Sequence, residues 1–108
     1  MTQRILANQT PDYTGQTITV AGWVHARRDH GGLIFIDLRD HTGLVQLVVS
    51  PEQTAAFALA EHARDEYVLR ARGEVRQRGE GLTNPNIASG SIELAVSELE
   101  VLNKAETL

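Results

Sequence analysis

Phe35 is the residue whose position says most about the chemistry this chain could do. In the stretch 33–40, strand alternation places Phe35 on the face opposite Ile34 and Ile36, next to Asp37. An aromatic ring on the polar face of a strand can stack on a nucleobase, a contact worth about 1–3 kcal/mol. The competing interpretation is that Phe35 packs in a second small core beneath a helix or loop, and the ring alone favours neither.

Polar residues near Phe35 favour the stacking interpretation. Gln46, on the next predicted strand, has the same outward parity, and its amide can both donate to and accept from a base edge. Arg27 and Arg28 end the first predicted strand and Arg78 ends the fourth, so their guanidinium groups could hold phosphates or bases. Whether Arg27 or Arg28 faces the ligand depends on an irregularity expected near Gly22.

Signatures of catalysis are missing from the sequence. The four histidines have no metal-ligand spacing, and no nucleophile elbow, HExxH, P-loop or GxGxxG motif occurs. Asp37 and Asp40 could form a carboxylate pair, but we expect instead an ion pair of Asp37 with Arg39 and a turn role for Asp40. We therefore expect this chain alone to lack catalytic residues, metal and cofactor.

Five segments with period-two alternation must position these side chains. They predict strands over residues 16–27, 33–40, 44–50, 66–78 and 91–103. Gly31-Gly32 and His41-Thr42-Gly43 mark the first two turns, and the changed parity of Leu99 predicts a bulge in the last strand.

A helix is predicted between the third and fourth strands. Residues 51–64 are rich in alanine, Ser50 could be the N-cap, and Pro51 suits the first helical position. Three strands, a helix and two strands is the order of the OB fold, an all-β five-stranded Greek-key barrel. The alternative is an open α+β sheet with one helix packed on it.

Composition restricts the class of protein. The chain has 108 residues, enough for one domain, and no cysteine. Its net charge is −4, which argues against a generic nucleic-acid coat protein, although nine of the ten basic residues are arginine. Arg64, Arg70 and Arg72 are expected to be solvated. Without a signal peptide or an apolar run of membrane-spanning length, we expect a cytoplasmic protein and no membrane partner.

The segments quoted next carry a family resemblance. The stretch GWVHARRDHGGLIFIDLRDHTGLVQLVV, with NPNIASGSIEL and SELEVLNKAETL, resembles the N-terminal anticodon-binding domain of bacterial aspartyl-tRNA synthetases. The resemblance covers essentially all 108 residues. Lysyl and asparaginyl relatives share the fold but fit the strands less closely.

The resemblance implies roles for particular residues. Phe35 would stack on the central uridine of the anticodon, and Gln46 and Arg28 would contact that uridine and its neighbour. Arg78 and Asn84 would lie beside the third base.

Further implications concern the first base and specificity. Glu93 would contact the first base, a guanine or its modified form. Ala26 stands where the family commonly has a third arginine, so one contact there is not expected. His30 and Gly81 resemble the non-discriminating enzymes, which charge both tRNA-Asp and tRNA-Asn with aspartate.

The resemblance also implies a longer parent protein. That parent would be a homodimeric class II aspartate–tRNA ligase whose catalytic domain, following Leu108, uses ATP and Mg²⁺. Two alternatives remain: a sequence-tolerant single-stranded nucleic-acid binder on the same barrel, and an interaction module without an RNA role.

Overall fold

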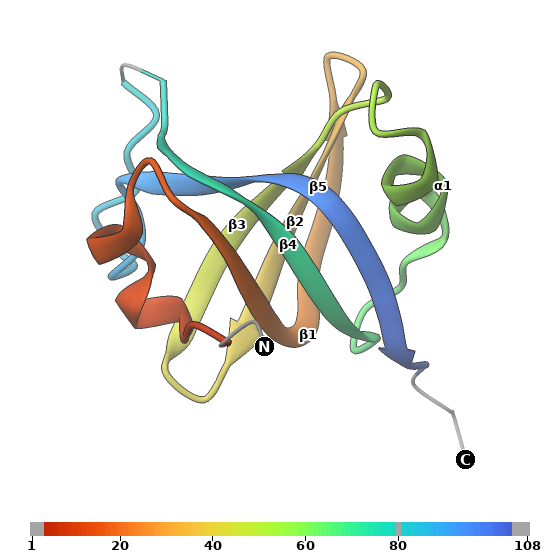
Figure 1. Ribbon diagram of the computed structural model, residues 1–108, viewed down its shortest axis with the longest axis horizontal. Coiled ribbons are helices and arrows are strands. Elements are labelled where there is room, and N and C mark those ends of the chain that lie inside the picture. The colour runs from red at the N-terminus through yellow and green to blue at the C-terminus, as the bar shows by residue number, and fades with distance from the viewer. Residues whose placement is uncertain (1–3, 80, 105–108) are drawn as a thin grey trace.

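The chain folds into a closed five-stranded barrel with strand order β1-β2-β3-β5-β4 (Figure 1). The computed structural model describes residues 4–79 and 81–104. Its strands are β1 (Thr17–His30), β2 (Leu33–Asp40), β3 (Gly43–Val49), β4 (Val68–Gln77) and β5 (Ile92–Asn103). Helix α1 (Thr54–His62) lies between β3 and β4 in the chain. The predicted OB barrel is confirmed, and the open sheet is wrong.

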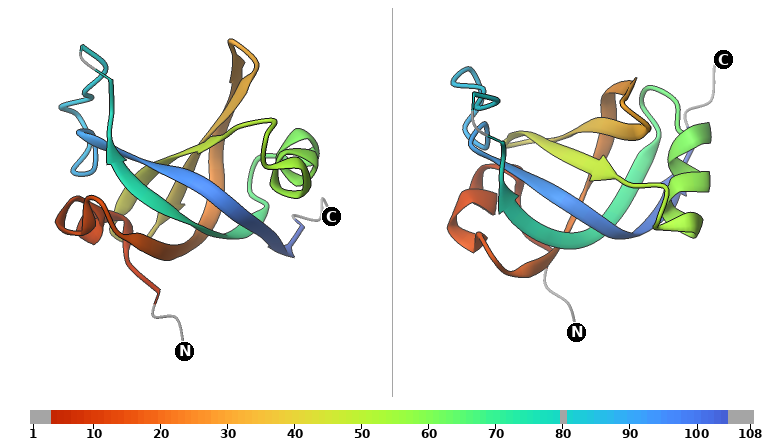
Figure 2. Two further views of the ribbon diagram at one scale, coloured as in Figure 1. Left: turned by 45° about the horizontal axis from the view of Figure 1, so that its top comes forward. Right: turned by 90° about the horizontal axis from the view of Figure 1, so that it is seen from above.

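Closure of the barrel depends on one short parallel pairing. All other neighbouring strands are antiparallel, whereas β3 and β5 pair in parallel through Leu47 with Leu94 and Val48 with Ala95. Helix α1 and a 3-10 helix, η1 (Ala7–Tyr13), cover opposite sides of the barrel (Figures 1 and 2). The outward side chains of β2 between them stay partly exposed.

Strand alternation sends aliphatic side chains into one core. Val45, Leu47 and Val49 on β3 are at most 1% exposed, as their parity predicts. Each such side chain contributes about 1.5–3 kcal/mol by leaving water. The core is completed from the other strands by residues that include Ile36, Leu38, Val20, Val24, Leu69, Val75, Leu94 and Val96.

The irregularities of β1 differ from the prediction. The bulge lies at His25, where the register with β2 shifts between Val24 and Ala26. Gly22 instead serves a close approach, because a Cβ atom there would lie 2.2 Å from the carbonyl oxygen of Arg39. The bulge that the changed parity of Leu99 predicts in β5 is confirmed. It appears as a shift in the pairing of β5 with β4, between Arg72 and Gly73 of β4.

The start of the helix was predicted wrongly. Helix α1 begins at Thr54 rather than Pro51, with Gln53 at the N-cap position. The Ser50 carbonyl accepts the Gln53 N–H at 3.0 Å and the Ser50 hydroxyl accepts the Glu52 N–H at 3.3 Å. These local bonds hold residues 50–53 in a turn, which competes with helix formation.

Over residues 4–79 and 81–104, no helix is long and apolar enough to cross a membrane.

Candidate nucleic-acid interface

Phe35 lies on the outer face of β2, as the alternation predicts. Its ring is half-buried, and its register partners are Arg28 on β1 and Val48 on β3. Its strand neighbours Ile34 and Ile36 are buried in the barrel, whereas Phe35 is not part of that core cluster of described residues. The exposed part of the ring is therefore presented on the outside of the barrel.

A chain of polar contacts begins beside this ring. Arg28 makes a two-pronged contact with Asp37, with Nη1 to Oδ2 at 2.8 Å and Nη2 to Oδ1 at 3.3 Å. The same Nη2 donates to Oε1 of Gln46 at 3.3 Å. The hydrogen bond to Asp37 raises the pKa of Arg28, which keeps the guanidinium charged.

The chain continues across the remaining two strands. Gln46 donates from Nε2 to Oε1 of Glu93 at 3.3 Å, and Arg76 donates from Nε to Oε2 of Glu93 at 2.7 Å. We call the five residues Arg28, Asp37, Gln46, Glu93 and Arg76 the polar ladder; it takes one residue from each strand of the barrel. Gln46 and Glu93 are each only 9% exposed, so these hydrogen bonds fix their side chains.

The contacts of the polar ladder show that one predicted ion pair was wrong, and they add two residues to the candidate site. Asp37 pairs with Arg28, not with Arg39, because the closest cation comes from the neighbouring strand. Asp40 is a turn residue, as expected: its carboxylate accepts hydrogen bonds from Thr42. Asp37 and Arg76 were not among the predicted site residues, since their partners depend on strand register.

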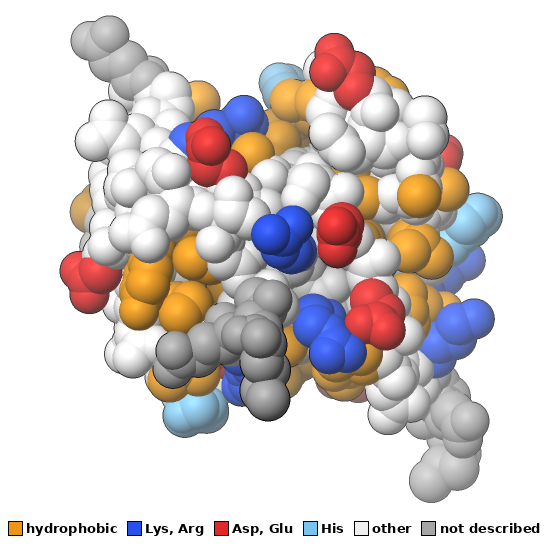
Figure 3. Space-filling model, in the orientation of Figure 1, with side chains coloured by type: hydrophobic (Ala, Val, Ile, Leu, Met, Phe, Trp, Pro, Cys, Tyr) orange, Lys and Arg blue, Asp and Glu red, His pale blue; other side chains and the backbone are white. Residues whose placement is uncertain are grey.

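The neighbouring arginines are largely paired with carboxylates. On β4, Arg70 lies 2.9 Å from Glu100 and Arg72 lies 3.8 Å from Glu98. Acidic and basic side chains accordingly lie next to one another over β4 and β5 (Figure 3). Such exposed pairs contribute little stability, but they reduce the cationic charge that β4 offers to phosphates.

Arg78 and Arg27 differ in their surroundings. Arg78, just beyond β4, donates from Nε to the Ile92 carbonyl at 2.9 Å, and burial lowers the pKa of its guanidinium. Ile92 directly precedes Glu93 in β5, so this hydrogen bond places Arg78 next to the polar ladder. Arg27 instead donates to the Ala60 carbonyl at 2.9 Å, because the bulge at His25 turns it toward α1. The structure therefore does not bring Arg27 to the Phe35 face.

Two loops border this face. The β1–β2 turn, which follows the exposed His30, and the β4–β5 loop, where Gly81 is exposed, both project toward the top of Figure 1. Gly31 and Gly32 have φ values of 60° and 83°, which confirms the predicted turn. Asn84 lies in the second loop, where its Oδ1 accepts the Asn86 N–H at 3.0 Å. The structure does not join Asn84 to the polar ladder.

A closed barrel with an outward aromatic ring and two bordering loops defines an OB fold with a face suited to nucleic acid. A family model described as an OB-fold nucleic acid binding domain, that of the tRNA anti-codon family, matches residues 18–102. The chain belongs to this family.

Solved structures of similar fold include two aminoacyl-tRNA synthetases. An asparaginyl-tRNA synthetase from Pyrococcus horikoshii, complexed with asparaginyl-adenylate, is 27% identical with a TM-score of 0.80; the match covers 97% of this chain and 23% of that one. An aspartyl-tRNA synthetase from Entamoeba histolytica, at 19% identity and a TM-score of 0.83, shares the fold over 99% of this chain and 22% of its own. This chain thus spans less than a quarter of either enzyme.

A third similar structure is a protein of about the same length as this domain. It is the OBody AM2EP06 bound to hen egg-white lysozyme, with 25% identity and a TM-score of 0.75. The match covers 92% of this chain and 91% of that one.

Proposed function

We propose that this chain reads the anticodon loop of a tRNA as the recognition domain of an aspartate–tRNA ligase. The observation that carries the proposal is Phe35, half-buried and outward, beside the fixed amide of Gln46 and carboxylate of Glu93. Unpaired loop bases stack on such rings and are read along their hydrogen-bonding edges. Membership of the anticodon family supports tRNA as the ligand.

Each base of the anticodon would meet a different part of the face. Phe35 stacks on the central uridine, and Arg28 and Gln46 contact that base and its neighbour. Glu93 accepts hydrogen bonds from the N–H groups of a guanine in first place. Arg78 and Asn84 lie beside the third base; Arg27 stays a candidate for the backbone only, since its Nε is held by α1.

The parent protein is proposed to be a class II homodimer in the cytoplasm. Its further domain would bind ATP, Mg²⁺ and aspartate and attach aspartate to the tRNA. The parent is also proposed to be non-discriminating, charging tRNA-Asp and tRNA-Asn with aspartate, because His30 and Gly81 resemble the non-discriminating enzymes and both are exposed, His30 at the end of β1 and Gly81 in the β4–β5 loop. A parent that charges tRNA-Asp alone would contradict the proposal that it is non-discriminating.

The test is binding of the 108-residue chain to labelled anticodon stem-loops of equal length. One loop carries GUC, a second GUU, and a third the same nucleotides in scrambled order. An anticodon reader binds the GUC loop at least about tenfold more tightly than the scrambled loop, since one base contact is worth about 1–3 kcal/mol. Relaxed reading of the third base predicts comparable affinity for GUU.

Equal affinity for all three loops would contradict the anticodon reader. It would favour the sequence-tolerant single-strand binder, which uses stacking and phosphate contacts without reading base edges. No affinity for any of them would favour a module without an RNA role.

A further inference from the structure

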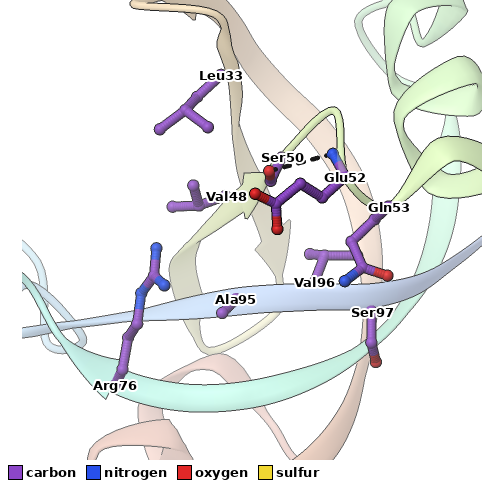
Figure 4. A pocket seen from close by; sticks show the side chains of 9 residues that line it. All are labelled: Leu33, Val48, Ser50, Glu52, Gln53, Arg76, Ala95, Val96 and Ser97. Carbon is purple, nitrogen blue, oxygen red and sulfur yellow. Dashed lines mark hydrogen bonds between the residues drawn. The ribbon is translucent and has the colours of Figure 1, made fainter.

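Arg76 forms the β4 end of the polar ladder and lies opposite Glu93 on β5. Its Nε donates to Oε2 of Glu93 at 2.7 Å, the shortest hydrogen bond within the ladder. The Arg76 side chain is 47% exposed, whereas that of Glu93 is 12% exposed. Figure 4 shows Arg76 extending from β4 across β5, at one side of a groove of about 360 Å³ that Val48 and Ala95 also line. A half-exposed guanidinium thus holds a carboxylate that is nearly buried.

The outer face carries an apolar row of side chains beside a polar row. The apolar row crosses β2, β3 and β5 in register and consists of Phe35, Val48 and Ala95. The polar row lies two residues along the same strands, about 7 Å away, and continues to β4; it consists of Asp37, Gln46, Glu93 and Arg76. A flat base that lies on the ring of Phe35 therefore turns one edge toward the polar row.

The amide of Gln46, in the middle of the polar row, is held between a donor and an acceptor. Arg28 can only donate and binds the amide oxygen, whereas the Glu93 carboxylate only accepts and binds the NH₂ group. One lone pair and one N–H of the amide stay outside these two bonds. A base edge in front of Gln46 therefore meets a donor and an acceptor in a fixed order.

The order of donor and acceptor separates the two pyrimidines of RNA. On the edge that pairs in a duplex, uracil presents a carbonyl acceptor beside an N–H donor, and cytosine presents an amino donor beside a nitrogen acceptor. An amide held in one orientation is complementary to only one of these edges. An amide that is free to turn over can bind either.

Loss of the Arg76 cation would leave the Glu93 carboxylate without an ion pair. Within residues 4–79 and 81–104, Arg76 provides the one ion pair that Glu93 makes. A nearly buried carboxylate without its cation is unfavourable, so it would turn toward water or another donor and release the NH₂ group of Gln46. That group then has a second acceptor close by, the carboxylate of Asp37, which is the register partner of Gln46.

We propose that Arg76 is a positioning residue, which through Glu93 keeps the Gln46 amide in one orientation and so lets the face distinguish uracil from cytosine. The inference rests on the proposed function, from which it takes the base on Phe35. It gives Arg76 a part in selectivity for one base without any direct contact between Arg76 and that base.

The first measurement needs no RNA. NMR of the isotope-labelled 108-residue chain reports the side-chain NH₂ group of Gln46, one of whose hydrogens is bonded to Glu93. Arg76→Gln should move these signals toward those of an exposed glutamine such as Gln16. Arg76→Lys, which keeps a cation for Glu93, should leave them near their wild-type positions.

The second measurement is binding of stem-loops that carry GUC or GCC. The wild-type chain should prefer GUC at least about tenfold, and Arg76→Gln should reduce this preference to about twofold or less. Arg76→Lys should restore it. Arg70→Gln is the matched control, because Arg70 carries the same charge and faces Glu100 across the same two strands, so its preference should equal that of wild type.

The possible outcomes separate this inference from the proposed function. If Arg76→Gln keeps the preference for GUC over GCC, with or without a shift of the Gln46 signals, the positioning role is overturned while the anticodon reader stands. A wild-type chain that binds GUC no better than a scrambled loop overturns both. Circular dichroism checks that Arg76→Gln is folded; if it is not, Arg76→Met, which also lacks the charge, takes its place in both measurements.

Discussion

Gln46 and Glu93 are polar side chains on the outside of a barrel, yet each is only 9% exposed. The Gln46 side chain must present an acceptor to Arg28 and a donor to Glu93. These two contacts therefore fix which end of the Gln46 amide is the oxygen. A partly desolvated carboxylate held from both sides is rigid before any ligand arrives. Such prior fixation reduces the conformational entropy lost on binding.

Glu93→Gln should weaken reading of the first base. A carboxylate accepts two hydrogen bonds from guanine, whereas glutamine presents a donor on one side. The preference for GUC over AUC loops is expected to fall about tenfold or more, since a bidentate base contact is worth about 1–3 kcal/mol of discrimination. Competition between the two loops measures the ratio. Glu98→Gln, an exposed neighbour on β5, should leave it unchanged; an unchanged ratio in Glu93→Gln would remove Glu93 from base reading.

For single residues, strand alternation explains which side-chain placements could be predicted from the sequence. The outward placement of Phe35 and Gln46 could be predicted because β2 and β3 are regular where these residues lie. The placement of Arg27 could not, because the bulge at His25 reverses parity after it. Asp37 and Arg76 were missed because their partners lie on other strands, at a register that local sequence does not encode.

Among the elements, β4 depends on a close approach to β5. A Cβ atom on Gly73 would lie 2.2 Å from the carbonyl oxygen of Ala95, next to the bulge of β5. Backbone atoms have little freedom to move away. The polar ladder joins these same two strands through Arg76 and Glu93, so the bulge and the site share one framework.

Gly73→Ala is expected to lower the free energy of unfolding by about 1–3 kcal/mol, the usual cost of overpacking. Urea denaturation followed by circular dichroism measures the change. Gly79→Ala is the matched control, because its Cβ atom would meet only the flexible end of the Leu82 side chain, at 3.2 Å. Equal stability of Gly73→Ala and wild type would show that β5 can move away without cost.

Asp40 fastens η1 to the β2–β3 turn. Its carboxylate accepts the Ala7 N–H at 2.8 Å, the Thr42 N–H at 2.8 Å and the Thr42 hydroxyl at 2.6 Å. Burial would raise the pKa of Asp40, but these hydrogen bonds outweigh it and the pKa is lowered. A lowered carboxyl pKa stabilises the fold above its unfolded value of about 3.9, and this stability is lost as the pH falls through the folded pKa.

Asp40→Asn should therefore lose about 1–3 kcal/mol of unfolding free energy at pH 7. Below about pH 4, the unfolding free energy of Asp40→Asn should also decrease less than that of wild type. Urea titrations at several pH values measure both. Asp12→Asn, an exposed carboxylate in η1, serves as the control. Identical pH profiles for Asp40→Asn and wild type would mean that the carboxylate does not hold η1.

At the scale of elements, the order of strands and helix was predictable and the start of the helix was not. Proline at position 51 suits a first helical turn, but the side chain and carbonyl of Ser50 bind nearby N–H groups and close a turn instead. Local competition of this kind depends on small differences in energy.

For the whole molecule, the net charge is acidic rather than basic. The net charge is −4, and the described arginines of β4 each face a glutamate of β5. The face around Phe35 offers Arg28, Arg76 and Arg78, of which two already hold carboxylates. Recognition by this domain should therefore rest on stacking and base edges more than on phosphates.

Salt dependence measures this balance. Three arginines can neutralise at most about three phosphates, which for single strands predicts a slope of log K against log salt of about −2 or shallower. Fluorescence anisotropy with the GUC loop at several salt concentrations gives the slope. A slope of about −5 would require roughly seven phosphate contacts and would contradict a base-reading face.

The central claim is tested most directly by replacing the ring. Phe35→Ala and Trp23→Ala each remove one aromatic side chain that is partly exposed, the first from the polar-ladder face and the second from a different part of the barrel. Binding of the GUC stem-loop should weaken about tenfold to a hundredfold in Phe35→Ala, in line with about 1–3 kcal/mol per stacked base, and stay within twofold of wild type in Trp23→Ala. Unchanged binding by Phe35→Ala, with the fold intact by circular dichroism, would contradict the account of this face as an anticodon reader.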